Sequence, residues 1–241
     1  MVKTCWSFWT ALKAVSCSLT DTHEGRTSSE TTTSSSDSST AYTNPVTSSI
    51  SYKGEPVPGQ NLSGTAMEDY YSYDWIENVP EQYKSAAKES VDRKNKQYKE
   101  DIFYMASTVY GEARGENITS KTAVAWSIRN RVDIKQLSVR EIVTKPSQYS
   151  CWSDDDVNYE ATTEPEEHAN KHGNQSIWND CIIISKKVIE SDKYLDITNG
   201  ATHYFDKSMD KNPPFWSSVP EAQRVYIEDV TNIRFYKGVG F

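Results

Sequence analysis

Ser107-Thr108-Val109-Tyr110-Gly111-Glu112-Ala113-Arg114-Gly115-Glu116 is the stretch on which the interpretation of this 241-residue chain depends. Glycine commonly ends a helix, so Gly111 predicts a helix terminus. Glu112 is therefore expected at the C-terminal end of a helix that packs in the core. The apolar residues ahead of it recur at the i, i+3, i+4, i+7 spacing of a buried helical face: Ile102, Met105, Ala106 and Val109.

A carboxylic acid at such a helix end is expected to have a raised pKa. Partial burial beside Tyr110 disfavours the charged form, and so does the negative end of the helix dipole. A raised pKa is what a general acid needs to protonate a glycosidic oxygen. A solvated glutamate near a helix end would have the same spacing, so the spacing alone leaves both interpretations of Glu112 open.

The charge and composition exclude one class of function. The net charge is −8, and no long run of lysine or arginine interrupts the acidic balance, which argues against binding to nucleic acid. Tyrosine and tryptophan are abundant, with 15 and 7 residues. These aromatic side chains suit a sugar-binding cleft, and they equally suit an ordinary core.

The first 67 residues differ in composition from the rest. Residues 21–67 are rich in serine, threonine and proline, and are predicted to be a disordered or extended linker. Residues 1–20 resemble either a short export signal followed by the lipoprotein-like box Ala14-Val15-Ser16-Cys17, or an amphipathic helix that docks on a partner. Lys13 interrupts the apolar run, and no segment reaches the roughly 18 apolar residues of a membrane span.

The remaining chain predicts an α+β domain that is mostly helical. Residues 68–99 are expected to form a surface strap and an exposed lead-in helix, and residues 100–241 the catalytic domain. Ser138 and Glu141 form a capping-box pattern at the start of a short helix. Further helices are expected from about Ser120 and over 177–190, with strands at 201–205 and 233–236.

Neither the cysteines nor the histidines indicate a metal site or a cofactor. Cys151 and Cys181 can pair in an oxidising compartment or remain buried thiols. His168 and His172 lack an H-E-x-x-H arrangement, and residues 154–156 lack the spacing of a calcium loop. These charges are interpreted as those of a solvated loop.

Four ordered segments resemble the cell wall hydrolase family of the spore cortex-lytic enzymes. The resemblance covers about Ile102 to Tyr236, and the Y-G-E-A-R-G-E core is its most specific part. The matching segments are Ser107–Glu116 with Ala123-Val124-Ala125 and Asn130-Arg131-Val132, then Gln148-Tyr149-Ser150-Cys151-Trp152, then Asn199-Gly200-Ala201-Thr202-His203-Tyr204-Phe205, and finally Trp216 with Ile233-Arg234-Phe235-Tyr236.

The resemblance implies a lysozyme-like helical domain related to lytic transglycosylases, which cut between N-acetylmuramic acid and N-acetylglucosamine. It implies that Glu112 is the catalytic acid, and that the same carboxylate then accepts the proton of the attacking C6 hydroxyl. A second carboxylate is not needed in such a reaction. Glu116 and Tyr204 are expected to support catalysis, with a purely structural role for Glu116 as the alternative.

The residues expected to bind substrate lie around this acid, although Trp152 and Tyr204 can also be core aromatics. The segment 154–173 is longer than the corresponding family loop, which bears on substrate fit. The expected substrate-binding residues are Tyr110, Gln148, Tyr149, Ser150, Trp152 and His203.

The expected function is peptidoglycan cleavage in the cell envelope. Its partners are glycan strands and, through the N-terminal region, other virion or envelope proteins. A phage lysis or virion-associated enzyme and a secreted or lipid-anchored bacterial protein are both compatible with the sequence. The alternative is a structural protein that binds peptidoglycan without cutting it.

Overall fold

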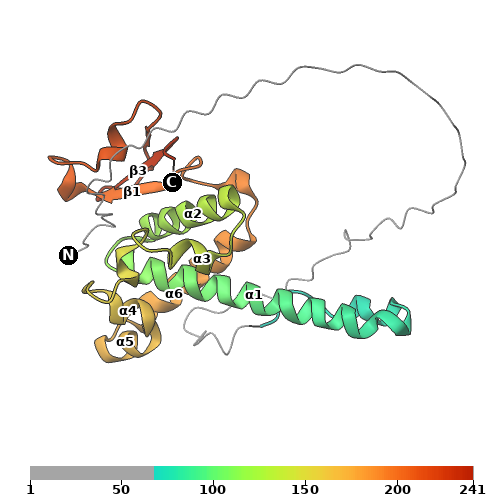
Figure 1. The fold of residues 1–241 in the computed structure, drawn as a ribbon. Coiled ribbons are helices and arrows are strands. Elements are labelled where there is room, and N and C mark those ends of the chain that lie inside the picture. Colours follow the sequence, from blue (N-terminus) through green and yellow to red (C-terminus); the bar gives the residue numbers. More distant parts are fainter. Residues whose placement is uncertain (1–67, 241) are drawn as a thin grey trace, which may run out of the picture. The chain divides into compact units, whose positions relative to one another are not determined.

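Residues 68–240 are described in the computed structural model (Figure 1). The signal or docking helix predicted at 1–20 and the linker predicted at 21–67 lie outside the described residues. Helices dominate the described part, and a small antiparallel sheet accompanies them. The prediction of a mostly helical α+β domain is confirmed. None of the helices in residues 68–240 combines the length and apolarity that crossing a membrane requires.

The longest element is α1, a single helix of 33 residues from Glu81 to Ala113. The expectation of a separate lead-in helix was therefore wrong, while the expected position of Glu112 at the C-terminal end of a buried helix is confirmed, with the helix ending at Ala113 rather than at Gly111. Gly111 is buried inside the last turn, where the absence of a side chain lets neighbouring segments approach. The glycine serves close packing here, rather than helix termination.

The strap ahead of α1 lies along the N-terminal half of that helix. Asn95 pairs with the backbone of Tyr71, accepting from its N–H at 2.7 Å and donating to its carbonyl at 3.1 Å. The ring of Tyr70 stacks on Tyr98 with centroids 4.7 Å apart. The strap includes the 3-10 helix η1, Asp74–Asn78. These contacts bury one side of a helix half that is otherwise mostly exposed.

Three further helices pack against the C-terminal half of α1. Helix α2, Ile118–Lys135, begins where the Asn117 side chain accepts from the backbone N–H of Ser120 at 2.8 Å. Helix α3, Val139–Val143, has the predicted capping box between Ser138 and Glu141. Helix α6, Gln175–Glu190, extends the predicted 177–190 helix by two residues.

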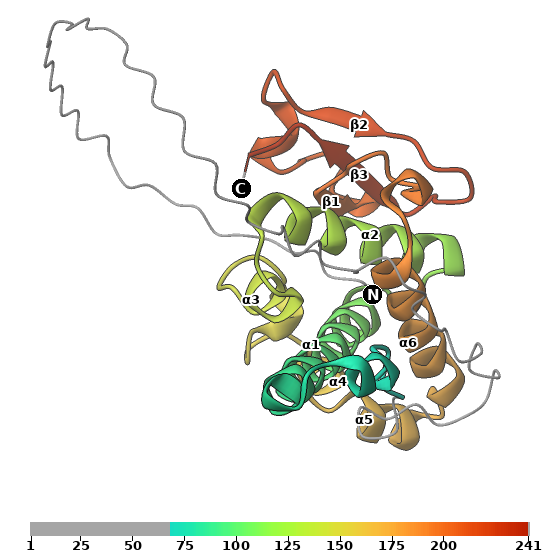
Figure 2. The same cartoon turned by 90° about the vertical axis from the view of Figure 1, so that its right-hand side faces the viewer.

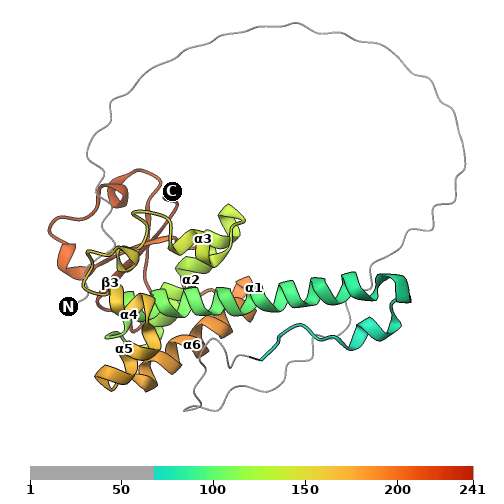
Figure 3. The same cartoon turned by 60° about the horizontal axis from the view of Figure 1, so that its bottom comes forward.

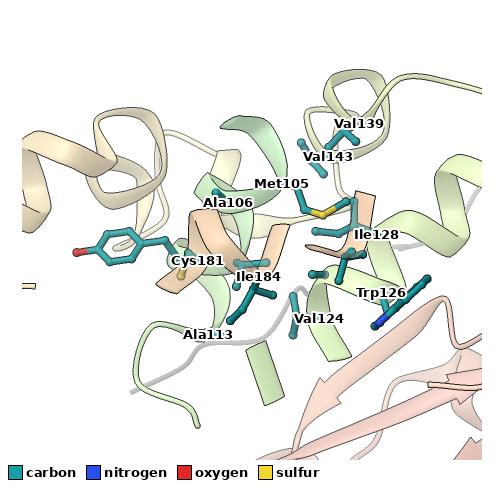
Figure 4. Close-up of a cluster of buried hydrophobic side chains, with 14 of the residues drawn as sticks. Met105, Ala106, Ala113, Val124, Trp126, Ile128, Val139, Val143, Cys181 and Ile184 are labelled. Carbon is teal, nitrogen blue, oxygen red and sulfur yellow. The ribbon is translucent and has the colours of Figure 1, made fainter. Parts of the chain in front are cut away.

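The core lies where these four helices meet. Helix α1 makes its most extensive packing with α6, and also contacts α2 and α3. Figure 4 shows the apolar side chains that converge from the four helices. They include Met105, Ala106 and Ala113 of α1, Val124, Trp126 and Ile128 of α2, Val139 and Val143 of α3, and Cys181 and Ile184 of α6.

The acidic segment predicted as a solvated loop instead contains two short helices. These are α4, Tyr159–Thr163, and α5, Pro165–His172. Pro165 suits the first turn of α5 because its missing N–H is unneeded there, and Gly173 ends the helix at a φ of 68°. The pattern was missed because few residues of each helix are buried. Figure 3 shows both helices beside the C-terminal end of α1.

The sheet has the order β1-β3-β2, with all neighbours antiparallel. Its strands are β1, His203–Asp206, β2, Gln223–Val225, and β3, Ile233–Lys237. Tyr204 is opposite Phe235, so these two side chains share the face that joins the core. Figure 2 shows α2 lying between the sheet and helices α1 and α6.

Strands β1 and β3 were predicted from the sequence, and β2 was not. The remaining short elements are 3-10 helices: η2, Ser150–Trp152, η3, Lys193–Leu195, η4, Lys207–Met209, and η5, Phe215–Ser218.

Replacing Gly111 with alanine is expected to destabilise the fold, although alanine is the better helix former. The new Cβ would collide with Oγ1 of Thr162 and would lie 3.0 Å from Cβ of Cys151. Overpacking of this kind costs about 1 to 3 kcal/mol. Chemical denaturation measures the loss. Gly115→Ala is the matched control, because nothing lies within 4 Å of its added Cβ. Equal stability of the two variants would contradict the packing role of Gly111.

Candidate active site

Glu112 lies in the last turn of α1 with only 3% of its surface exposed. Its Oε2 accepts a hydrogen bond from the hydroxyl of Tyr204 at 3.3 Å. Its Oε1 is buried and has no hydrogen-bond partner of ordinary geometry among the described residues. A buried carboxyl oxygen without a partner carries a cost, and such groups concentrate at sites where a ligand or a proton is handled.

Burial raises the pKa of Glu112 from 4.5 to about 7. Loss of hydration disfavours the charged carboxylate, and the negative charge of Asp156 adds to this effect. The thiol and backbone N–H of Cys151 and the hydroxyl of Tyr204 act in the opposite direction, since they favour the charged form. The group can therefore both give and accept a proton near neutral pH.

Tyr204 reaches Glu112 from the inner face of β1. Its ring packs on Phe235, with centroids 5.5 Å apart, and lies 6.5 Å from the ring of Tyr149. Tyr149 is also buried, with 3% exposure. The acid is thus bonded to one phenol side chain, Tyr204, which lies beside a second phenol from a separate segment.

Asn130 and Arg131 of α2 hold the start of β1 in place. Asn130 donates to the carbonyl of Ala201 at 3.0 Å, and Arg131 donates to the carbonyl of Thr202 at 2.5 Å. Both side chains are almost completely buried. Since β1 carries Tyr204, these two bonds fix the position of the phenol relative to the end of α1.

Arg131 also organises the segment that carries the expected cleft residues. Its guanidinium donates to Oε1 of Gln148 at 3.0 Å and lies over the ring of Tyr149 at 5.0 Å from the centroid. From the sequence, Arg131 was assigned only to a segment that resembles the family, with no role of its own. A charged residue between the apolar positions Ile128 and Val132 is the signal that could have identified it.

The 3-10 helix η2 is fastened directly to α1. The indole N–H of Trp152 donates to Oγ1 of Thr108 at 3.0 Å, and its ring lies 5.5 Å from that of Tyr104. Trp152 is therefore a partly buried packing residue as well as a neighbour of the site, while Ser150 is half-buried. Cys151 and Cys181 are both buried thiols and form no disulfide.

Two residues expected to bind substrate point elsewhere. Tyr110 is fully buried on the opposite side of α1, with its hydroxyl 3.1 Å from Nδ1 of His168. His203 is on the outer face of β1, where it packs on Trp216. Burial lowers the pKa of His203 to about 3, so its ring is neutral at physiological pH.

The carboxylate of Glu116 is turned toward β3 and not toward Glu112. Its two oxygens accept from the side-chain amide of Asn232 at 3.2 and 3.4 Å, and its backbone carbonyl accepts from the ammonium group of Lys121. The neighbouring Asn117 donates to the carbonyl of Asp229 at 2.8 Å. Glu116 thus ties the α1–α2 turn to the sheet.

Among residues 68–240, no cluster of three or more histidine, cysteine or acidic side chains is arranged to hold a metal ion. His168 lies on α5, where its ring is 4.3 Å from that of His172. Interpreting both histidines as parts of a solvated loop was wrong for His168, because it is half-buried and contacts Tyr110.

A buried acid whose pKa is raised to about 7 and which is bonded to a phenol is an arrangement suited to general acid–base chemistry. A model of the cell wall hydrolase family matches residues 115–236, just over half of the chain. The chain belongs to this family, and its substrate is peptidoglycan of the cell wall, outside the cytoplasm. No curated protein and no solved structure matches the chain. The matched segment begins after Glu112 and includes Tyr204.

The buried carboxyl group of Glu112 is expected to make stability depend on pH. The pKa of Glu112 is about 7 in the folded state and 4.5 in the unfolded state. The contribution of this group to stability is therefore fully present below pH 4.5 and is lost as the pH rises through about 7. Glu112→Gln removes the buried charge. It should therefore stabilise the fold at pH 8, by up to about 3 kcal/mol, and much less at pH 4.5.

Thermal or chemical denaturation of wild type and Glu112→Gln at both pH values measures this difference. Glu116→Gln is the control, because its carboxylate is half-exposed and bonded to Asn232. A Glu112→Gln variant that is less stable than wild type at pH 8 would show that the carboxylate is not an uncompensated buried charge.

Proposed function

We propose that this cell wall hydrolase is a glycosidase that cleaves the bond between N-acetylmuramic acid and N-acetylglucosamine, with Glu112 as its catalytic acid. The observation that carries the proposal is the burial of Glu112, which raises its pKa to about 7. An acid with this pKa is protonated in a useful fraction at neutral pH, so it can protonate a glycosidic oxygen.

The proposed reaction is that of a lytic transglycosylase. Protonated Glu112 donates its proton to the glycosidic oxygen, and the bond from that oxygen to C1 of the muramic acid breaks. The resulting carboxylate accepts the proton of the C6 hydroxyl as the C6 oxygen bonds to C1, which gives a 1,6-anhydro sugar and restores the acid. Tyr204 supports the charged state between the two steps, because its hydroxyl donates to Oε2.

Two nearby carboxylates are already engaged in structural contacts. Asp156 accepts from the backbone N–H of Asn158 at 2.8 Å, and Glu116 accepts from Asn232. Each of these carboxylates is therefore held by a contact within the fold. A single-carboxylate mechanism agrees with this arrangement, whereas most retaining and inverting glycosidases use two carboxylates.

Glu112→Gln is expected to lower the rate of sacculus digestion by at least about 100-fold, because amide nitrogen cannot donate the required proton. Purified sacculi are digested and the fragments are analysed by mass spectrometry. Glu116→Gln is the matched control and should retain most of the activity. Retained cutting by Glu112→Gln would remove Glu112 from its role.

The fragments also distinguish the chemistries. Anhydro ends support transglycosylation, reducing ends indicate hydrolysis, and released stem peptides indicate an amidase. Binding to sacculi with no fragments released would favour the alternative of a structural peptidoglycan-binding protein.

The activity is expected to fall as the pH rises through about 7. The proton donor is the protonated form of Glu112, and this form is lost above the pKa of about 7. The initial rate of fragment release from sacculi between pH 5 and 9 measures the profile. A rate that stays constant from pH 6 to 9 would contradict a donor with this pKa.

Delivery as a phage lysis or virion-associated enzyme remains a prediction from the sequence of residues 1–67, as does the alternative of a secreted or lipid-anchored bacterial protein. Mass spectrometry of the mature protein from its natural source tests both. An intact N-terminus in a purified particle supports phage delivery, and a lipid on Cys17 supports the anchored form.

A further inference from the structure

We propose that Cys151 is a positioning residue for Glu112, because its buried side chain packs against Gly111, the residue that precedes the acid in the last turn of α1. Its thiol and backbone N–H act as hydrogen-bond donors toward the carboxyl group of Glu112. The inference rests on the proposed function for its catalytic meaning. The contact itself is a property of the fold and can be tested without any substrate.

The close approach of Cys151 depends on the residue before the acid. Gly111 has no side chain, and a Cβ placed there would lie 3.0 Å from Cβ and 3.2 Å from Sγ of Cys151. Real Cβ atoms rarely have contacts as short as these. Gly111 thus leaves, directly beside Glu112, the space in which Cys151 approaches the acid.

Two anchors hold Cys151 at this position. The next residue, Trp152, is bonded through its indole N–H to Thr108 of α1 at 3.0 Å. Two residues before Cys151, the ring of Tyr149 is covered by the guanidinium of Arg131. Cys151 has 1% of its surface exposed, so water does not replace its donors. The chain on both sides of Cys151 is therefore held by other helices, α1 and α2.

The electrostatic consequence follows from the groups around the acid. The titratable groups that act on Glu112 are Cys151 from η2, Tyr204 from β1 and Asp156 from the loop after η2. Cys151 and Tyr204 favour the carboxylate, while burial and Asp156 favour the neutral acid. Without the Cys151 thiol the charged form loses one of its supports, so the pKa of Glu112 should rise further.

The thiol therefore has a role in both steps of the proposed reaction. If burial were not opposed, the pKa of Glu112 would be higher and the acid would release its proton slowly. Cys151 stabilises the carboxylate without adding a formal charge. The protonated and charged forms of Glu112 therefore differ less in free energy. Cysteine suits this place because its weak donor is compact and tolerates apolar surroundings.

The test is a direct titration of Glu112 in the full-length protein. Glutamate carboxyl carbons are labelled with ¹³C, and the signal of Glu112 is assigned as the one missing from Glu112→Gln. Cys151→Ala should move the titration midpoint up by about half a unit to one unit. Cys151→Ser keeps a donor at the same place and should bring the midpoint back toward the wild-type value.

Cys181→Ala is the matched control. Cys181 is an equally buried thiol on α6, and burial likewise raises its own pKa, to about 12, but the groups acting on it are Lys121 and Asp180. Cys181→Ala removes a thiol from the same core and should leave the titration midpoint of Glu112 unchanged. An unchanged midpoint in Cys151→Ala, or an equal shift in both alanine variants, would overturn the proposal.

The pH profile of sacculus digestion gives a second readout. The decline of activity at high pH should move upward in Cys151→Ala with the same displacement as the titration midpoint, and a structural defect would instead lower the rate equally at every pH. If wild type releases no fragments, or if Glu112→Gln still cuts, the proposed function fails. The titration would still decide whether Cys151 controls Glu112.

Discussion

The hydrogen bonds from Asn130 and Arg131 to the backbone of Ala201 and Thr202 are the interaction on which the arrangement of the site depends. The sheet is small and lies on α2, as Figure 2 shows, so it has little apolar surface with which to hold its own position. The two buried polar side chains, on consecutive residues of α2, fix the position that the sheet alone would not determine. Through them, one helix determines where β1 begins, and β1 determines where Tyr204 meets the end of α1.

The burial that raises the pKa of Glu112 also makes this residue destabilising for the fold. A glutamate at 3% exposure with one unpartnered oxygen lowers the stability of the fold whenever it is charged, and the surrounding helices must compensate. The core shown in Figure 4 does so, since α2, α3 and α6 converge on the C-terminal half of α1. The neutral donors around Glu112 moderate its pKa without introducing a cation. A lysine or arginine paired with the acid would have lowered the pKa and removed the proton at neutral pH.

Local patterns in the sequence predicted much of the fold and the position of Glu112 at the end of a buried helix. The i, i+3, i+4, i+7 stripe before Gly111 indicated the buried part of α1, and the Ser138–Glu141 pattern indicated α3. The errors arose where long-range contacts decide the outcome. Gly111 ends many helices by its local preference, but here Thr162, far along the chain, occupies the space beside it. The burial of Tyr110 and the outward position of His203 depend on the packing of α5 and η5, which no local period encodes.

The contact between Gly111 and Thr162 has a consequence for how this family can vary. Helices α4 and α5 belong to an acidic segment that meets the last turns of α1 at this contact and at the contact of Tyr110 with His168. The Thr162 hydroxyl itself donates to the carbonyl of Asn158 at 2.9 Å. The residues of the two helices are otherwise mostly exposed or half-buried, apart from Ala161, Pro165 and Ala169. The exposed positions can therefore change in size and charge, provided that the segment returns a small hydroxyl-bearing side chain to the space beside Gly111.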